Sequence, residues 1–327
     1  MALGPAHGAP RFERLNFVLG QGDQGETAIV RDALRARGVQ RVADCGSGTD
    51  RLFNALDDQI VDLVVYDFEL LRDRFVDVMQ MIRKKSRGLN PFTVIVATVD
   101  DSNAETVKRL VRAGVDDLIR RPITGERLFQ SISSLMEQRK PFIVANDYVG
   151  PSRRLDGRTE RPAGHSMIQV PNTMRSRAID GVSEDEIQRM VEEAVSNLRD
   201  KQLVACGGEI ENLSRVLMDR YALLKESPDR IDEVRAILRR LEVVSDDLHL
   251  RCRGTQFERI GDLAKMVLAL TQRINRSSIG QAVTEVQLVG KLAAAITRAL
   301  AVERDSVGVM RDIADTIANF TGAKSRH

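Results

Sequence analysis

The chain has 327 residues, of which 43% are hydrophobic, 29% are charged and only 4% are aromatic, and its formal net charge is +2. This length exceeds what one hydrophobic core usually supports, so two domains are expected, and the small net charge argues against a nucleic-acid binder with a global basic field. The three cysteines are scattered and form no CxxC pair, which argues against a disulfide scaffold and a zinc site. The sequence has no signal-peptide core and no apolar stretch of bilayer length, which argues against a membrane protein. Together these features favour the cytoplasm.

The first 140 residues alternate short apolar runs with amphipathic segments. The runs that predict strands are residues 15–19, 40–45, 61–67, 92–99 and 116–121. The segments that predict helices are residues 26–38, 48–58, 72–85, 101–114 and 125–139. Such alternation predicts right-handed crossovers and a parallel sheet covered on both faces. We therefore expect an α/β fold with a five-stranded, doubly wound, flavodoxin-like sheet, followed by an all-α region.

The later chain changes character twice. Residues 141–182 are rich in Arg, Pro and Gly and predict a linker, whose arginines would suit an acidic partner, although a solvated tether is the simpler interpretation. From Ser183 the pattern is helical, and Ser183 with Glu186 forms a capping-box signature. A helical bundle is predicted rather than a solenoid. The expected divisions are a disordered N-terminus at 1–13, an α/β domain at 14–140, the linker at 141–182, a helical domain at 183–321 and a disordered tail at 322–327.

One predicted strand ends on a carboxylate. The run from Val61 to Tyr66 is mostly apolar and is followed at once by Asp67. Open parallel sheets bind ligands at the carboxyl ends of their strands, which favours a chemical role for Asp67. The structural alternative is that Asp67 caps the segment that follows it.

Several motifs, in order along the chain, resemble the receiver domain of bacterial response regulators. Asp67 ends the third strand, Thr98 ends the fourth in "VIVAT", and "RAGVDDLIRRPI" matches the motif that precedes the last helix of the family. "ADCGSGTDRLFNAL" resembles a further family segment. The resemblance covers residues 14–138.

The resemblance implies roles for individual residues. Asp67 would be the phosphoacceptor, Thr98 and Arg121 would contact the phosphoryl group, and Pro122 would be a conformational, cis proline. Arg121 stands where the family has a Lys, so it keeps the charge but presents a planar fork.

The departures from the family concern the metal and the switch. A receiver is phosphorylated with Mg²⁺ held by an acidic pair after the first strand, and those positions are Gln21 and Gly22. Asp23 lies one residue beyond the positions of the acidic pair, so Asp23 and Asp67 are the possible metal ligands. Mg²⁺ is expected as a cofactor only if the receiver is phosphorylated. Leu118 occupies the usual aromatic switch position. Asp67 is thus either an acceptor with a weakened metal site or a relic carboxylate in a pseudo-receiver.

The helical half has a distant similarity to histidine phosphotransfer domains. His249 precedes Gly254 by five residues where that family has four, which rotates the glycine by about 100° around a helix. A structural histidine is the preferred interpretation, and phosphotransfer by His249 is the alternative.

The combined prediction is an atypical bacterial response regulator. It would relay a two-component signal through contacts with a histidine kinase or a downstream effector. A homodimer is one possible assembly, and enzymatic activity is not expected. One alternative is a phosphorylatable receiver coupled to a phosphotransfer or phosphatase-like bundle. Another is a DNA-binding regulator, which interspersed charges of both signs disfavour.

Overall fold

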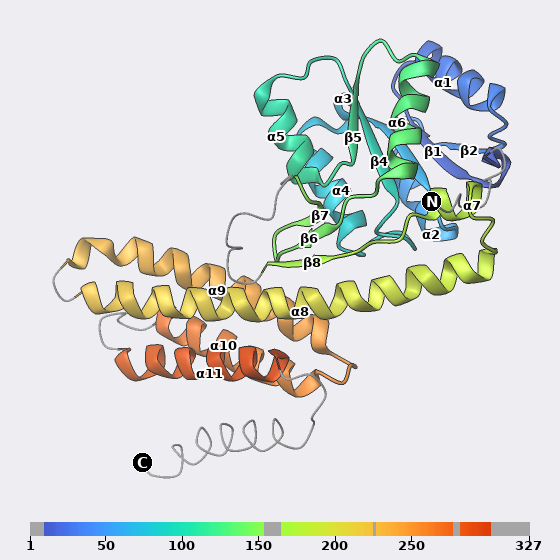
Figure 1. Ribbon diagram of the computed structural model, residues 1–327. Helices are drawn as coiled ribbons and strands as arrows, with labels where there is room; N and C mark the ends of the chain where they lie inside the picture. The colour runs from blue at the N-terminus through green and yellow to red at the C-terminus, as the bar shows by residue number, and fades with distance from the viewer. Residues whose placement is uncertain (1–9, 154–164, 225–226, 277–281, 302–327) are drawn as a thin grey trace, which may run out of the picture. The chain divides into compact units, whose positions relative to one another are not determined.

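Figure 1 shows the computed structural model, which describes residues 10–153, 165–224, 227–276 and 282–301. The chain divides into two compact units. The first contains Met1–Arg158 and Met167–Leu198, and the second contains Thr159–Ser166 and Arg199–His327. The boundary after Leu198 falls within one helix. The expected disordered tail at 322–327 and most of the expected disordered N-terminus lie outside the described residues.

The first unit is built on a parallel sheet with strand order β2-β1-β3-β4-β5. Its strands are β1 (Asn16–Gly20), β2 (Arg41–Asp44), β3 (Leu63–Asp67), β4 (Val94–Val99) and β5 (Asp117–Arg120). The helices that alternate with them are α1 (Gln24–Ala36), α2 (Thr49–Asp58), α3 (Phe68–Leu71), α4 (Phe75–Arg83), α5 (Ala104–Ala113) and α6 (Gly125–Glu137). Short 3₁₀ turns lie at η1 (Phe12–Arg14) and η2 (Arg72–Arg74). The predicted flavodoxin-like α/β fold is confirmed.

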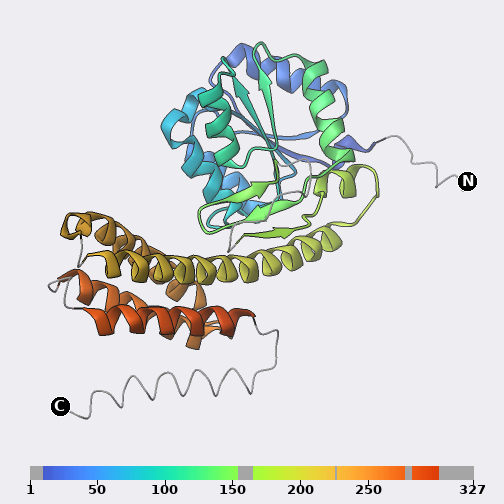
Figure 2. The same ribbon diagram turned by 60° about the vertical axis from the view of Figure 1, so that its left-hand side comes forward.

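Helices cover both faces of this sheet (Figures 1 and 2). In β3, Leu63 and Val65 enter a core shared with α1 and α6, while Val64 and Tyr66 enter a core shared with α2, α4 and α5. Successive side chains of a strand point to opposite faces, so a strand buried on both faces must be apolar at almost every position. This explains the apolar run from Leu63 to Tyr66 that precedes Asp67.

Much of the segment predicted as a linker is folded, which corrects that expectation. It forms β6 (Phe142–Val144), β7 (Val149–Pro151), β8 (Ser166–Ile168) and α7 (Thr173–Ala178), with the three strands in the order β7-β6-β8. Phe142, Val149 and Ile168 join a further core with Phe92 and with the first turns of α8. The apolar side chains in this Pro- and Gly-rich stretch are spaced too irregularly to show a helical or strand period, but the tertiary structure buries them.

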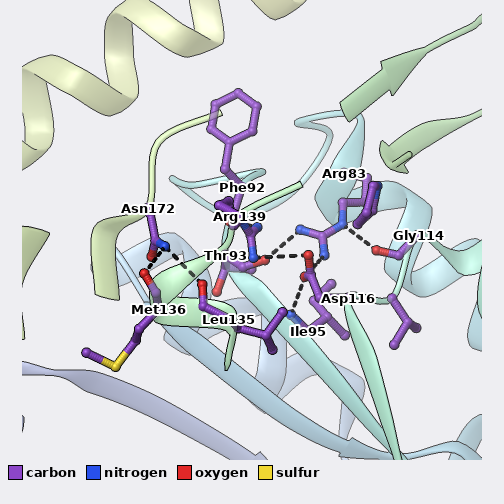
Figure 3. Close-up of polar contacts among 12 residues, drawn as sticks. Arg83, Phe92, Thr93, Ile95, Gly114, Asp116, Leu135, Met136, Arg139 and Asn172 are labelled. Carbon is purple, nitrogen blue, oxygen red and sulfur yellow. Dashed lines mark hydrogen bonds and ion pairs between the residues drawn. The ribbon is translucent and has the colours of Figure 1, made fainter. Parts of the chain in front are cut away.

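A buried ionic cluster attaches this folded segment to the sheet (Figure 3). Nη2 of Arg83 lies 2.7 Å from Oδ2 of Asp116, and Nη1 of Arg139 lies 3.0 Å from Oδ1 of the same carboxylate. Arg83 also donates to the carbonyl oxygens of Gly114 and Thr93, at 2.9 and 2.6 Å. Burial lowers the pKa of Arg83 to about 10, and the charge of Asp116 opposes that shift. The carboxylate therefore compensates two guanidinium groups inside the protein.

A second buried ion pair anchors α7. Nε of Arg177 lies 3.2 Å from Oδ1 of Asp62, and Nη2 of Arg177 donates to Glu184 at 2.7 Å. Asp62 also accepts a hydrogen bond of 2.9 Å from the backbone N–H of Asn16. Asn172 joins α7 to α6, because its side-chain amide donates to the last carbonyls of α6. These contacts lie at the amino ends of the strands, opposite the end that carries Asp67.

The second unit is a helical bundle, as predicted. Its helices are the later part of α8 (Glu184–Leu223), α9 (Ile231–Cys252), α10 (Glu258–Arg276) and α11 (Val283–Ala301), with a 3₁₀ turn η3 (Pro228–Arg230) before α9. The capping box is present, since the Ser183 hydroxyl and backbone N–H both donate to Glu186. Helix α8 continues through Gly207, where a Cβ atom would lie 2.6 Å from Leu300 of α11. Within the described ranges, no helix is long and apolar enough to cross a bilayer.

Candidate functional site

Three predicted site residues lie together at the carboxyl end of the sheet. Asp67 is the last residue of β3 and is paired in register with Thr98 of β4. Arg121 directly follows β5 and its Nη2 atom lies 2.5 Å from Oδ2 of Asp67. Asp67 is only 3% exposed, so its charge is largely removed from water. The parallel sheet brings these residues together because strands of the same direction end at the same edge.

The guanidinium of Arg121 contacts three carboxylates. Besides Asp67, its Nε lies 2.7 Å from Glu26 of α1 and its Nη1 lies 2.8 Å from Asp100, which follows β4. Burial alone would lower the pKa of Arg121, but hydrogen bonds to Asp100, Asp67 and Glu26 raise it above the usual range. Each edge of the planar fork has a different partner, which a compact ammonium group would not reproduce. The cluster is an ion-pair network that runs from the buried Asp67 to the exposed Asp100.

Both carboxylate oxygens of Asp67 have partners. Oδ2 meets Arg121, and Oδ1 accepts a hydrogen bond of 2.9 Å from the backbone N–H of Glu69. Asp67 is thereby the N-cap of α3, as the structural alternative from the sequence proposed. Capping and pairing with Arg121 occur together, so neither interpretation of Asp67 excludes the other.

The positions where a receiver carries its acidic pair differ in chemistry. The Thr98 hydroxyl donates to Oε1 of Gln21 at 3.4 Å, and the Gln21 Nε2 is buried without a hydrogen-bond partner among the described residues. Gly22 leaves space beside the aspartate, since a Cβ there would lie 3.3 Å from Oδ2 of Asp67. Neither residue offers a carboxylate.

Asp23 is used locally. Its Oδ1 accepts a hydrogen bond of 2.8 Å from the backbone N–H of Glu26 and caps α1. In the part of the chain that the structure describes, no group of three or more His, Cys, Asp or Glu side chains is arranged to hold a metal ion. Glu26 and Asp100 reach the site, but with Asp67 they surround the Arg121 guanidinium. The donor set therefore does not fit the Mg²⁺ site of a receiver.

Glu26 and Asp100 are the site residues that the sequence analysis missed. Glu26 lies in the first turn of α1, where an acidic residue is ordinary because it complements the helix dipole. Asp100 follows β4 at the same sheet edge as Asp67, and this placement is the one feature of the sequence that could have identified it as a site residue.

Two further predicted positions adjoin the site. Arg121 is followed by a cis peptide bond to Pro122. The side chain of Leu118 is half-buried against the core next to α5.

His249 lies in the helical unit, on α9. Its ring Nδ1 is 3.0 Å from the carbonyl oxygen of Gly261 on α10. A Cβ at Gly261 would lie 2.8 Å from Cys252, so the two helices approach closely at this point. Gly254 lies beyond the end of α9, with a φ of +66°. Because a carbonyl oxygen only accepts, Nδ1 is the nitrogen that donates in this contact, and Nε2 is the ring nitrogen outside it.

No protein-family model matches the chain, and no curated protein is significantly similar to it in sequence.

Proposed function

We propose that the first unit is a receiver-like module that works in bacterial two-component signalling by binding other proteins, with no turnover of a small substrate. A histidine kinase or a downstream effector is the expected partner, and the cytoplasm is the expected compartment. The helical unit would carry the output, with self-association as one way of doing so. The α/β fold and the residues at its carboxyl edge support this proposal.

The contact between Arg121 and Asp67 carries the argument. A phosphoacceptor needs a free carboxylate oxygen and a divalent cation to offset the charge of the incoming phosphoryl group. Here the guanidinium already occupies Oδ2, and Gln21 and Gly22 supply no charged metal ligand. The arrangement favours recognition through a fixed shape over reversible phosphorylation.

The surface proposed for partner binding comprises α5, β5 and α6. It adjoins the site through β5, whose end leads directly into Arg121. Arg121 also contacts Asp100, in the connection that leads into α5. Arg121, which pairs with Asp67, is therefore linked to the start of α5 and to the end of β5.

Intact-mass measurement after incubation with acetyl phosphate and Mg²⁺ tests the proposal. We expect no mass gain for the wild-type protein, and none for the Asp67→Asn control. The Arg121→Lys variant, which restores the family residue, separates the two causes: continued inertness assigns the block to Gln21 and Gly22, and labelling assigns it to the guanidinium. Addition of one phosphoryl group to the wild-type protein, abolished by Asp67→Asn, would refute the proposal.

Phosphotransfer by the helical unit is the second candidate, and the hydrogen bond of His249 favours it. When the ring is neutral, that bond places the proton on Nδ1 and makes Nε2 the nitrogen that would attack a phosphoryl group. The experiment is transfer of label from a phosphorylated partner to the full chain, with His249→Ala as the control. Label that persists in His249→Ala would exclude this role.

A further inference from the structure

The turn that follows Asp67 has an unusual backbone conformation. It consists of α3 (Phe68–Leu71) and the 3₁₀ turn η2 (Arg72–Arg74), and Arg72, the first residue of η2, has φ = 40° and ψ = −104°. This combination lies outside the right-handed, left-handed and extended regions. Such a conformation is strained, and it persists only where surrounding contacts impose it.

Arg109 on α5 supplies those contacts. Its Nη2 donates to the carbonyl oxygen of Arg72 and lies 3.1 Å from Oδ1 of Asp73. Its guanidinium carbon also lies 5.0 Å from the centre of the Phe68 ring. The Asp73 side chain is 98% exposed, so that ion pair contributes little. The bond to the backbone and the stacking on Phe68 are the contacts that matter, and one side chain from α5 spans the turn.

Phe68 connects this turn to Asp67. It is the next residue in the chain and is buried, with its ring centre 5.2 Å from that of Phe75. The hydrogen bond from Glu69 N to Oδ1 of Asp67 closes the same turn. A displacement of the Asp67 carboxylate therefore moves the cap of α3 and the ring on which Arg109 stacks.

From this geometry we infer that Arg109 couples the Asp67 site to α5. When Asp67 is held by Arg121, the turn keeps Phe68 and the Arg72 carbonyl in place for Arg109. When Asp67 is released or altered, those two contacts change and α5 loosens. The inference deepens the proposed function, because α5 belongs to the proposed partner surface. The contacts of Arg109 would also connect Asp67 to α5 without an aromatic side chain at the usual switch position, which is Leu118 in this chain.

Hydrogen–deuterium exchange of the full chain tests this coupling. We expect Asp67→Asn to raise exchange of the α5 amides (residues 104–113) by about fivefold or more, the lower range of an allosteric coupling. In the Arg109→Ala background exchange of α5 should already be raised, and Asp67→Asn should add no further increase. Peptides from α2 serve as the internal reference. Arg112→Ala, which removes an exposed arginine from the same helix, should leave the response to Asp67→Asn intact.

Phe68→Leu is the second variant, since it keeps an apolar side chain under Arg109 but removes the aromatic ring. We expect it to weaken the response of α5 to Asp67→Asn. An unchanged response in both the Arg109→Ala and Phe68→Leu backgrounds would overturn the inference. Phosphorylation of the wild-type protein would overturn the proposed function and leave the exchange result standing, so the two failures are distinguishable.

Discussion

The guanidinium of Arg121 lies 2.5 Å from Asp67, a contact that joins the end of β5 to the end of β3 across β4. The same group reaches Glu26 in α1 and Asp100 after β4. Segments that are distant in sequence are thus tied together at the edge of the sheet where ligands of this fold bind. At the opposite edge, the pairs of Asp116 with Arg139 and of Asp62 with Arg177 attach the folded segment that follows α6.

Removal of Arg121 should destabilise the first unit. In Arg121→Ala, the carboxylate of Asp67 remains buried without its counter-charge, and Glu26 and Asp100 lose their shared partner. We expect a loss of about 2–3 kcal/mol in the free energy of unfolding, measured by urea denaturation. The double variant Arg121→Ala/Asp67→Asn should recover at least about 1 kcal/mol, because the unpaired charge is gone. Strictly additive losses would show that the pair is not coupled.

Substitution of Asp116 should lower the free energy of unfolding more than substitution of an exposed aspartate. Asp116→Asn leaves the buried guanidinium groups of Arg83 and Arg139 without a counter-charge, and we expect a loss of about 3–5 kcal/mol. The matched control is Asp44→Asn, which weakens the half-exposed pair with Arg31 and should cost at most about 1 kcal/mol. Denaturant unfolding compares the two variants. Equal effects would mean that the buried cluster contributes no more than a surface pair.

Asp62 should give the protein a distinct dependence of stability on pH. Burial raises the pKa of Asp62 to about 6, although Arg177 and the backbone N–H of Asn16 act to lower it. In the unfolded chain the group titrates near its ordinary pKa of about 4. The folded state therefore binds the proton more tightly, and stability from this group is present below pH 4 and lost as the pH rises towards 6.

The comparison of the wild-type protein with Asp62→Asn isolates that effect. The difference in unfolding free energy, wild type minus variant, should fall as the pH rises from about 4 to about 6 and level off above it. Unfolding monitored by circular dichroism at several pH values gives this difference. A difference that rises with pH over that range would mean that Arg177 outweighs burial and lowers the pKa.

Glycine at position 72 should stabilise the protein. Arg72→Gly relieves the positive φ and loses only an exposed ion pair with Glu69, so we expect a gain of about 1 kcal/mol in unfolding free energy. Arg74→Gly is the matched control, because Arg74 has φ = −85° and ψ = −7° and glycine there should be destabilising by about 0.5–1 kcal/mol. Thermal denaturation distinguishes the two. A loss of stability in Arg72→Gly would contradict the idea that the contacts of Arg109 hold a strained residue.

The sequence by itself determined the α/β class, the order of its five strands and helices along the chain, and the helical character of the later half. These follow from local periodicity, since apolar runs, capping residues such as Ser183 and terminators such as Gly114 act within a few residues. It also placed Asp67, Thr98 and the residue after β5 at one sheet edge, because strand direction follows from alternation with helices.

Only the tertiary structure decided which side chains meet. Glu26 and Arg121, or Asp62 and Arg177, are separated by long stretches of chain, and no local pattern marks either pair. Folding of residues 142–153 and 165–178 likewise depended on burial against Phe92 and α8, which outweighed a composition typical of linkers. Helix α8 runs through Gly207 for the same reason, because close packing by Leu300 outweighs the low helix propensity of glycine. Contact energies between distant segments depend on the assembled geometry, and that geometry is absent from a linear pattern.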